Sequence, residues 1–308
     1  MYFKAMQAIV ALITAIISFI SPIPPTGTTP DLELTDVNPH PIAEAAKTQD
    51  FTVMSYNVKI SGDGLRAVEK RAPHIVNTVK EKMPDSVGFQ ETDKKWVELI
   101  AEMMPEYAYV AKYREDGIEK GESSAIFYLK DKYELVEEGH FWLSETPDAP
   151  SKGWDAACER ICSYAILKDK ETGFVYAHFN AHFDHVGTEA PTKSVELVSA
   201  KIAEIAPDIP VVFTGDFNLS EGSENYNNLL ACGLKDTKYL AKKHDDHATY
   251  HGYHVVSLTT KPIDFIFVNG YVSTVESSKI DSGFVDHILA SDHFPITVKL
   301  TLFNGGND

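Results

Sequence analysis

The 308-residue sequence has few cysteines and few basic side chains for its length. None of its three cysteines, Cys158, Cys162 and Cys232, belongs to the paired Cys and His spacing of a structural zinc site, so disulfide or zinc scaffolding is not expected. We interpret Cys158 and Cys162 as packed side chains, with a disulfide bridge between them as the alternative.

Lys and Arg number 28 against 45 Asp and Glu, and the formal charge of −17 repels the phosphate backbone that nonspecific nucleic-acid binders neutralise. Long-range steering towards DNA is therefore not expected.

The sequence also lacks internal repeats, which excludes solenoids and propellers. One long apolar run stands at the N-terminus, where AMQAIVALITAIISFI follows Lys4. This run is shorter than the ~20 residues of a membrane span and predicts a signal peptide within residues 1–21. No small-x-small cleavage site stands out near Ser21, and an uncleaved N-terminal anchor is the alternative. The protein is expected to be secreted or extracytoplasmic, with membrane attachment only through residues 1–21.

Composition divides the rest of the chain into a linker, one domain and a short tail. Residues 22–50 are rich in Pro and Thr and cannot bury enough apolar surface to offset the entropy of ordering, so they predict a disordered linker. The 44% hydrophobic fraction suffices for one packed catalytic domain over residues 51–303. Residues 304–308 are expected to form a flexible tail, and we expect a monomer.

Short apolar runs alternate with amphipathic segments after residue 51, the pattern of an α/β protein. Helices are predicted at 65–82, 93–104 and 192–206. Strands are predicted at 51–58, 84–91, 124–129, 161–167, 174–183, 211–217, 263–268 and 294–300. Several of these strands end in Asn, Glu, His or Asp. Because strand ends can meet at one sheet edge, this pattern predicts an active-site rim.

The polar strand ends have the chemistry that phosphate-ester hydrolysis needs. A cation must neutralise the phosphate oxygens, and Mg²⁺ prefers oxygen ligands. Glu91 and Asp292 are candidate ligands, and Asn57 can complete the shell through its amide oxygen. Asp216 and Asn218 lie on one side of their strand because side chains alternate with period two, so one can activate water while the other orients it.

Two histidines accompany these acids. His182 and His293 are placed to bind phosphoryl oxygens or to move protons near neutral pH, and Asp264 can fix the tautomer of His293. Each signal alone also fits a structural residue or an Asx turn. Their conjunction favours an active site.

The motifs MSYNV, FQE, NAHFDH, GDFN, IDFIF and SDHFPI occur in the order found in the endonuclease/exonuclease/phosphatase superfamily. Over about residues 51–303 the chain resembles this superfamily, which includes relatives of pancreatic-type deoxyribonuclease and apurinic/apyrimidinic endonucleases, and it is similar to a bacterial branch. The resemblance implies a four-layer α/β (α+β) sandwich, in which two mixed β-sheets pack face to face and are flanked by helices. It also implies bound Mg²⁺ or Mn²⁺.

The resemblance implies roles for the matching positions. The metal would be near Asn57, Glu91 and Asp292. The attacking water and the scissile phosphate would be handled by His182, Asp216, Asn218, Asp264 and His293. Arg160 would contact an anion, although an exposed structural Arg is the alternative. Glu122 would orient His182, with its register open by one residue.

Two segments are candidates for substrate recognition. Residues 141–160 contain Trp142 and Trp154, and we predict that Trp154 contacts a sugar or base, with cover of the sheet edge as the alternative. The cluster HDDHATYHGYH (244–254) matches no closed zinc pattern and reads as a polar loop, in which His251 is predicted to face the pocket. The sequence thus predicts a metal-dependent phosphoesterase acting on a small phosphorylated substrate. A secreted nuclease acting on DNA or RNA and a catalytically idle module that binds phosphorylated ligands are the alternatives.

Overall fold

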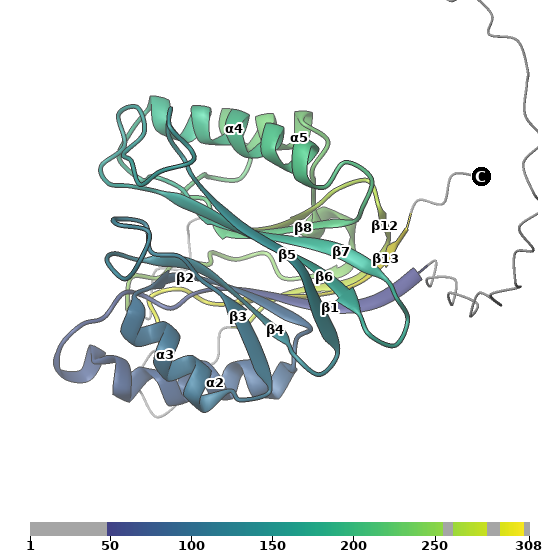
Figure 1. Ribbon diagram of the computed structural model, residues 1–308, viewed down its shortest axis with the longest axis horizontal. Helices are drawn as coiled ribbons and strands as arrows, with labels where there is room; N and C mark the ends of the chain where they lie inside the picture. The colour runs from purple at the N-terminus through teal and green to yellow at the C-terminus, as the bar shows by residue number, and fades with distance from the viewer. Residues whose placement is uncertain (1–47, 255–260, 282–289, 305–308) are drawn as a thin grey trace, which may run out of the picture. The chain divides into compact units, whose positions relative to one another are not determined.

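The computed structural model describes residues 48–254, 261–281 and 290–304. Two mixed β-sheets pack face to face, with α4 and α5 on the outer side of one and α2 and α3 on the outer side of the other (Figure 1). This arrangement confirms the predicted four-layer sandwich. The predicted signal peptide or anchor, most of the predicted linker and most of the predicted tail lie outside the described residues and stay predictions.

The first sheet has seven strands in the order β10-β12-β13-β1-β2-β4-β3. Its strands are β1 (Thr48–Asn57), β2 (Ser86–Thr92), β3 (Tyr107–Val110), β4 (Ser123–Leu129), β10 (Ala241–His244), β12 (Val272–Ile280) and β13 (Ile296–Phe303). β1 runs parallel to β2 and antiparallel to β13. These pairings bring the end of β1 between the end of β2 on one side and the start of β13 on the other.

The second sheet has six strands in the order β5-β6-β7-β8-β11-β9. Its strands are β5 (Tyr133–Trp142), β6 (Ile161–Asp169), β7 (Val175–His182), β8 (Val211–Asp216), β9 (Lys235–Asp236) and β11 (Asp264–Val268). β7 and β8 are parallel and β11 is antiparallel to β8. The register pairs His182 with Asp216 and Asp216 with Asp264, so three polar residues line up across the sheet.

Within the described residues, five α-helices connect and cover the sheets. They are α2 (Val68–Lys82), α3 (Lys94–Met103), α4 (Glu189–Ile205), α5 (Glu224–Ala231) and α6 (Thr237–Leu240), and a short 3-10 helix, η1, spans Gly64–Arg66. Local capping explains where α3 begins, because the Asp93 carboxylate accepts a hydrogen bond from the backbone N–H of Trp96. None of the described helices is both long enough and apolar enough to span a membrane.

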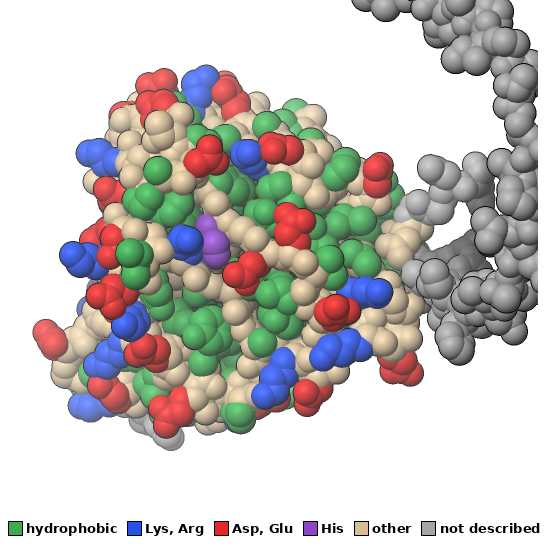
Figure 2. All heavy atoms as spheres, in the orientation of Figure 1, with side chains coloured by type: hydrophobic (Ala, Val, Ile, Leu, Met, Phe, Trp, Pro, Cys, Tyr) green, Lys and Arg blue, Asp and Glu red, His purple; other side chains and the backbone are tan. Residues whose placement is uncertain are grey.

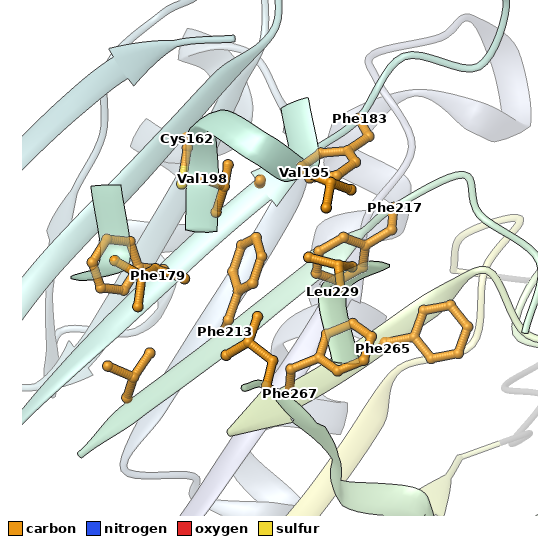
Figure 3. Close-up of a cluster of buried hydrophobic side chains, with 14 of the residues drawn as sticks. Cys162, Phe179, Phe183, Val195, Val198, Phe213, Phe217, Leu229, Phe265 and Phe267 are labelled. Atoms are coloured by element: carbon orange, nitrogen blue, oxygen red, sulfur yellow. The ribbon is translucent and has the colours of Figure 1, made fainter. Parts of the chain in front are cut away.

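The helices bury apolar faces of the two sheets. Phenylalanines from β7, β8 and β11 form a tightly packed cluster beneath α4 and α5 (Figure 3). Phe217 lies edge-on to both Phe213 and Phe267, at centroid distances of 4.8 and 5.2 Å. Met54, Val87 and Phe127 project from the other sheet into the α2 and α3 layer. Each outer layer therefore holds one sheet rigidly from behind.

The predicted strands and helices are all present, with small shifts at their ends. β1 begins at Thr48, ahead of residue 51, and α4 begins at Glu189, ahead of residue 192. The strands β3, β5, β9, β10 and β12 and the helices α5 and α6 were not predicted. All three cysteines are free. Cys162 is buried in the core as predicted, and Cys158 is partly exposed.

Candidate active site

The inner faces of the central strands change from apolar to catalytic residues along their length. On β1 the inward side chains are Phe51 and Val53, then Ser55 and Asn57, and β8 repeats the change from Val212 through Thr214 to Asp216. Since inward side chains recur at every second residue, each strand can contribute to the core and then to the site. The predicted rim of polar strand ends therefore exists.

Asp216, His293 and Asp264 form a chain of contacts at this rim. His293 Nδ1 lies 2.8 Å from Asp264 Oδ2, and His293 Nε2 lies 3.6 Å from Asp216 Oδ2. Burial and the nearby Asp264 carboxylate raise the pKa of Asp216. Burial disfavours the charged imidazole, but Asp264 and Asp216 outweigh it and raise the pKa of His293. The predicted pairing of Asp264 with His293 is present and fixes the ring so that Nε2 faces Asp216.

His182 approaches Asp216 from the end of β7. Its Nε2 lies 3.6 Å from Asp216 Oδ2, and its Nδ1 lies 3.8 Å from Glu122 Oε2. Burial, together with nearby Arg160 and Arg114, lowers the pKa of His182 well below its usual range, which favours a neutral ring. Glu122 is in turn gripped by both terminal nitrogens of Arg114, at 2.8 and 3.0 Å. The structure thus brings Glu122 beside His182, where an orienting residue was predicted.

Asn57 links two of the acids through its amide nitrogen. Nδ2 donates to Glu91 Oε1 at 3.1 Å and to Asp216 Oδ2 at 2.9 Å, while Oδ1 accepts from the backbone N–H of Lys59 at 2.9 Å. Because the Lys59 N–H requires an oxygen opposite it, this amide orientation follows from the hydrogen bonds themselves. In this arrangement Asn57 positions the carboxylates, and its predicted role as a ligand through Oδ1 stays a prediction.

Three groups offer closely spaced donor atoms for a metal ion: Glu91, Asp216 and His293, whose ligand atoms lie within 4.8 Å of one another. Asp292 adjoins this group, since its Oδ1 lies 4.0 Å from His293 Nε2 and Lys59 Nζ lies 3.5 Å from both Glu91 Oε2 and Asp292 Oδ2. Asp292 Oδ1 is buried without a hydrogen-bond partner among the described residues. Buried carboxylates with an unpaired oxygen fit a hard divalent cation.

The backbone is strained where these side chains are presented. Lys59, Glu91 and Asn218 have positive φ angles of 58°, 59° and 50° although none is glycine. Hydrogen bonds hold Asn218, because its N–H donates to Asp216 Oδ1 at 3.1 Å and its Nδ2 donates to the Phe183 carbonyl at 3.0 Å. Strain of this kind persists where the surroundings fix the conformation, which is common at functional sites.

The site opens into a cavity of about 490 Å³. Its lining includes Lys59, Glu91, Arg114, Glu122, Cys158, Arg160, His182, His185, Asp216, Asn218, Tyr250 and His293. Arg160 is buried, and its Nη2 lies 2.9 Å from His185 Nδ1 while its Nε lies 3.5 Å from Asp184 Oδ1. Its Nη1 is buried without a partner among the described residues, so a guanidinium donor remains for an anion. An exposed structural role for Arg160 is therefore wrong.

Two predicted substrate contacts lie outside this lining. His251 is buried with its ring 4.3 Å from Phe294, and its Nδ1 accepts from the backbone N–H of Tyr253 at 3.2 Å. Trp154 is partly exposed, and its backbone N–H donates to Glu145 Oε2 at 3.0 Å. Trp142 is buried, and its Nε1 donates to the Arg114 carbonyl at 2.6 Å. The roles of Trp154 and His251 in substrate binding stay predictions.

Sequence reasoning missed Lys59, Arg114, His185 and Tyr250. Lys59 and His185 lie inside or next to motifs that were recognised, MSYNV and NAHFDH, and their polar character was the available signal. Tyr250 lies in the recognised TYHGY segment and packs on His293, at a centroid distance of 4.9 Å. Arg114 lies in a loop without a recognisable pattern.

Comparison with known proteins gives a consistent assignment. The model of the Endonuclease/Exonuclease/phosphatase family matches residues 54–293. An endonuclease/exonuclease/phosphatase family protein from Bacteroides thetaiotaomicron is 35% identical, with a TM-score of 0.78 over 83% of this chain and 98% of that chain. The mannosyl-6-phosphatase of the same species is 36% identical, with a TM-score of 0.77 over 81% of this chain and 99% of that chain.

A more distant relative comes from a virus. An uncharacterized protein of Acanthamoeba polyphaga mimivirus is 32% identical over 161 residues, which are 50% of this chain and 60% of the viral protein. The family match covers the whole site, from the strand that ends in Asn57 to His293. Together with the sandwich fold and the order of the motifs, these findings show that the chain belongs to the endonuclease/exonuclease/phosphatase family of phosphoester hydrolases.

Proposed function

We propose that this protein hydrolyses a phosphate monoester of a small molecule, using a bound Mg²⁺ or Mn²⁺ ion and in-line attack by water. The observation that carries the proposal is the convergence of Glu91, Asp216 and His293, with donor atoms within 4.8 Å of one another, at one wall of an open cavity. Glu91 and the adjoining Asp292 would hold the ion, which leaves Asp216 and His293 to face water and substrate. Hard carboxylate oxygens are the donors that these ions prefer. When bound, the ion supplies positive charge to the phosphoryl oxygens.

The chain's own residues supply positioning and proton transfer. Asp216 is oriented by Asn57 Nδ2 and by the N–H of Asn218, so its carboxylate can accept the proton of the attacking water. His293, held by Asp264, and His182, beside Glu122, face Asp216 from two directions at 3.6 Å each. Their Nε2 atoms can hydrogen-bond the phosphoryl oxygens as charge develops there.

The cavity and its charges favour a small substrate with a terminal phosphate. A volume of about 490 Å³ is within the usual range for small-molecule sites. Arg160 presents an unpaired guanidinium nitrogen, which suits a phosphate dianion. On the face shown in Figure 2, basic side chains are interspersed with acidic ones, whereas polymer binding uses a continuous basic groove. The similarity to a mannosyl-6-phosphatase makes sugar phosphates the first substrates to test.

A substrate panel tests this proposal directly. The purified protein is incubated with Mg²⁺ or Mn²⁺ and, separately, with sugar phosphates, nucleotides, plasmid DNA and RNA, and each reaction is repeated in EDTA. We expect phosphate release from at least one sugar phosphate and none in EDTA. Cleavage of DNA or RNA without phosphate release would establish the nuclease instead. Ligand binding without turnover of any phosphoester would establish the idle binding module.

Substitutions at the site provide the mechanistic test. We expect Asp216→Ala and His293→Ala to lower kcat by at least about 10²-fold, the scale for loss of one acid/base or electrostatic group. Asp208→Ala, which removes an exposed carboxylate between α4 and β8, is the matched control and should leave kcat unchanged. Circular dichroism checks that each variant is folded. Full activity in either folded site variant would contradict the assignment.

A further inference from the structure

Lys59 occupies an unusual position between two buried acids. Its Nζ lies 3.5 Å from Glu91 Oε2 and 3.5 Å from Asp292 Oδ2. Both acids are buried, whereas the lysine side chain is 38% exposed and lines the cavity. A positive charge at this point balances two carboxylates that would otherwise repel each other in a poorly solvated environment.

The backbone of Lys59 is fixed although its side chain reaches solvent. Its carbonyl accepts from Arg71 Nη2 at 2.8 Å and from Trp96 Nε1 at 2.9 Å, and its N–H donates to Asn57 Oδ1 at 2.9 Å. These three bonds hold the residue in a left-handed conformation, with φ of 58°. The ammonium is therefore delivered to the acids by a rigid anchor, while its flexible stem allows it to leave them.

We propose that the Lys59 ammonium competes with the divalent cation for Glu91 and Asp292, which weakens metal binding until an anionic substrate enters the cavity. This inference rests on the proposed function, because it concerns the same cation. Two positive charges cannot share one pair of carboxylates without strong repulsion, so the metal gains these ligands only when Lys59 moves away.

The cavity offers Lys59 an alternative partner when substrate is present. A phosphate group bound near Arg160 and His182 adds negative charge within reach of a lysine that lines the same cavity. The ammonium can then pair with the substrate, which removes its competition with the cation. Because binding linkage is reciprocal, the metal and the anion each strengthen binding of the other.

Calorimetric titration of the full chain with Mn²⁺ alone tests the competition. We expect Lys59→Met to lower the Kd for Mn²⁺ by about tenfold or more, the order expected from loss of two partly exposed competing ion pairs. Lys59→Arg keeps the charge and should retain the weaker affinity. The matched control is Lys95→Met, which removes the same charge from a lysine paired with Glu69 on the helical layer, and should bind Mn²⁺ as the wild type does.

A second titration in saturating sulfate, a tetrahedral anion that cannot be hydrolysed, tests the coupling. Sulfate should lower the Kd for Mn²⁺ by a larger factor in the wild type than in Lys59→Met, because the variant has no ammonium to redirect. Lys59→Gln replaces Lys59→Met in both titrations if the methionine variant does not fold.

The outcomes separate the two proposals. Unchanged or weaker Mn²⁺ binding in the folded Lys59→Met or Lys59→Gln variant overturns the competition and leaves the phosphoesterase intact. Equal effects of sulfate on the wild type and the variant overturn the coupling to substrate. Hydrolysis by the wild type in EDTA contradicts the metal-dependent function itself.

Discussion

The strands β7, β8 and β11 present two different faces to their surroundings. Towards α4 and α5 they project Phe179, Phe213, Phe217, Phe265 and Phe267. Towards the other sheet and the site they project His178, Asn180, Thr214, Asp216 and Asp264. Both sets are buried, and they alternate along the same strands. Burial alone therefore does not separate structural from functional positions in this protein, whereas side-chain direction together with position along the strand does.

The two faces are stabilised by different interactions. The phenylalanine face gains stability from removal of apolar area from water and from close packing. On the polar face, Asn180 Nδ2 donates to the carbonyls of Phe89 and Ala125 at 2.8 and 2.9 Å, and its Oδ1 accepts from Gln90 Nε2 at 2.7 Å. We call the hydrogen-bonded side chains of Gln90, His178, Asn180 and Thr214 the polar layer; they lie between the sheets, next to the catalytic residues. This layer ties the sheets together by directional bonds, so the site inherits a fixed geometry.

The largest loss of stability is expected on the phenylalanine face. Phe213 is fully buried and packs on Phe217 at 4.8 Å, so Phe213→Ala removes contacts and leaves a cavity. We expect the free energy of unfolding to fall by about 3–5 kcal/mol, measured by urea denaturation. Phe213→Leu is the control and should cost clearly less because it refills much of the space. Equal losses from the two variants would show that the stability of this face does not depend on how much of the buried volume the side chain fills.

A smaller loss is expected at Gly88, where one sheet lies directly against side chains of the other. A Cβ atom on Gly88 would lie 2.0 Å from Thr214 Oγ1 and 2.7 Å from Asn180 Oδ1, so Gly88→Ala forces these partners apart. We expect the free energy of unfolding to fall by about 1–3 kcal/mol, typical of overpacking. Gly270→Ala is the matched control, because nothing lies within 4 Å of its added Cβ. If Gly88→Ala left the free energy of unfolding unchanged, the polar layer would be loosely packed.

The polar layer should also respond to pH. His178 is fully buried between Ser86 Oγ and Thr214 Oγ1, at 2.9 Å from each, and burial lowers its pKa from 6.5 to about 3. Below pH 6.5 the unfolded chain binds a proton that the folded chain excludes, so stability is lost as the pH falls from 6.5 towards 3.

Urea denaturation at several pH values between 6.5 and 5 measures this contribution. We expect the wild type to lose about 1 kcal/mol per pH unit more than His178→Gln, which keeps a polar group but does not titrate. Other groups titrate in both proteins and cancel in the difference. Parallel stability curves for the two proteins would mean that water reaches the imidazole and that the polar layer is open.

The residues that end apolar strands could be found from the sequence. Asn57, His182 and Asp216 each follow a run of buried residues, and this change in polarity is visible without a structure. The pairing of Asp264 with His293 was predicted because a carboxylate can fix the tautomer of a histidine, and the superfamily's motifs implied the same pairing; no local pattern connects residues so far apart in the chain. Their actual contact, at 2.8 Å, depends on the antiparallel pairing of β11 with β8.

Other parts of the fold and site have no local signal. β5 lies at the edge of its sheet, and its exposed stretch carries Glu134, Glu137 and Glu138, so it lacks the apolar run of a central strand. β12 is likewise polar along most of its length. Arg114 reaches the site from a loop, where it binds Glu122 and lines the cavity. Such residues are placed by tertiary packing, and sequence patterns alone do not reveal them.

The smallest effect is expected from exchanging a hydroxyl for a methyl group within the polar layer. Thr214 Oγ1 lies 2.9 Å from His178 Nε2 and 3.0 Å from Asn180 Oδ1, so Thr214→Val removes one partner from each at nearly constant volume. We expect a loss of about 1–2 kcal/mol in the free energy of unfolding, the scale for two buried hydrogen bonds. The reciprocal control is Val212→Thr, two residues earlier on the same face of β8, where apolar neighbours would leave the new hydroxyl unpaired. If the two faces differ as described, Thr214→Val should also lower kcat through the neighbouring Asp216, whereas Val212→Thr should affect stability alone. A change in kcat of equal size in both variants would show that the polar layer does not hold the site in place.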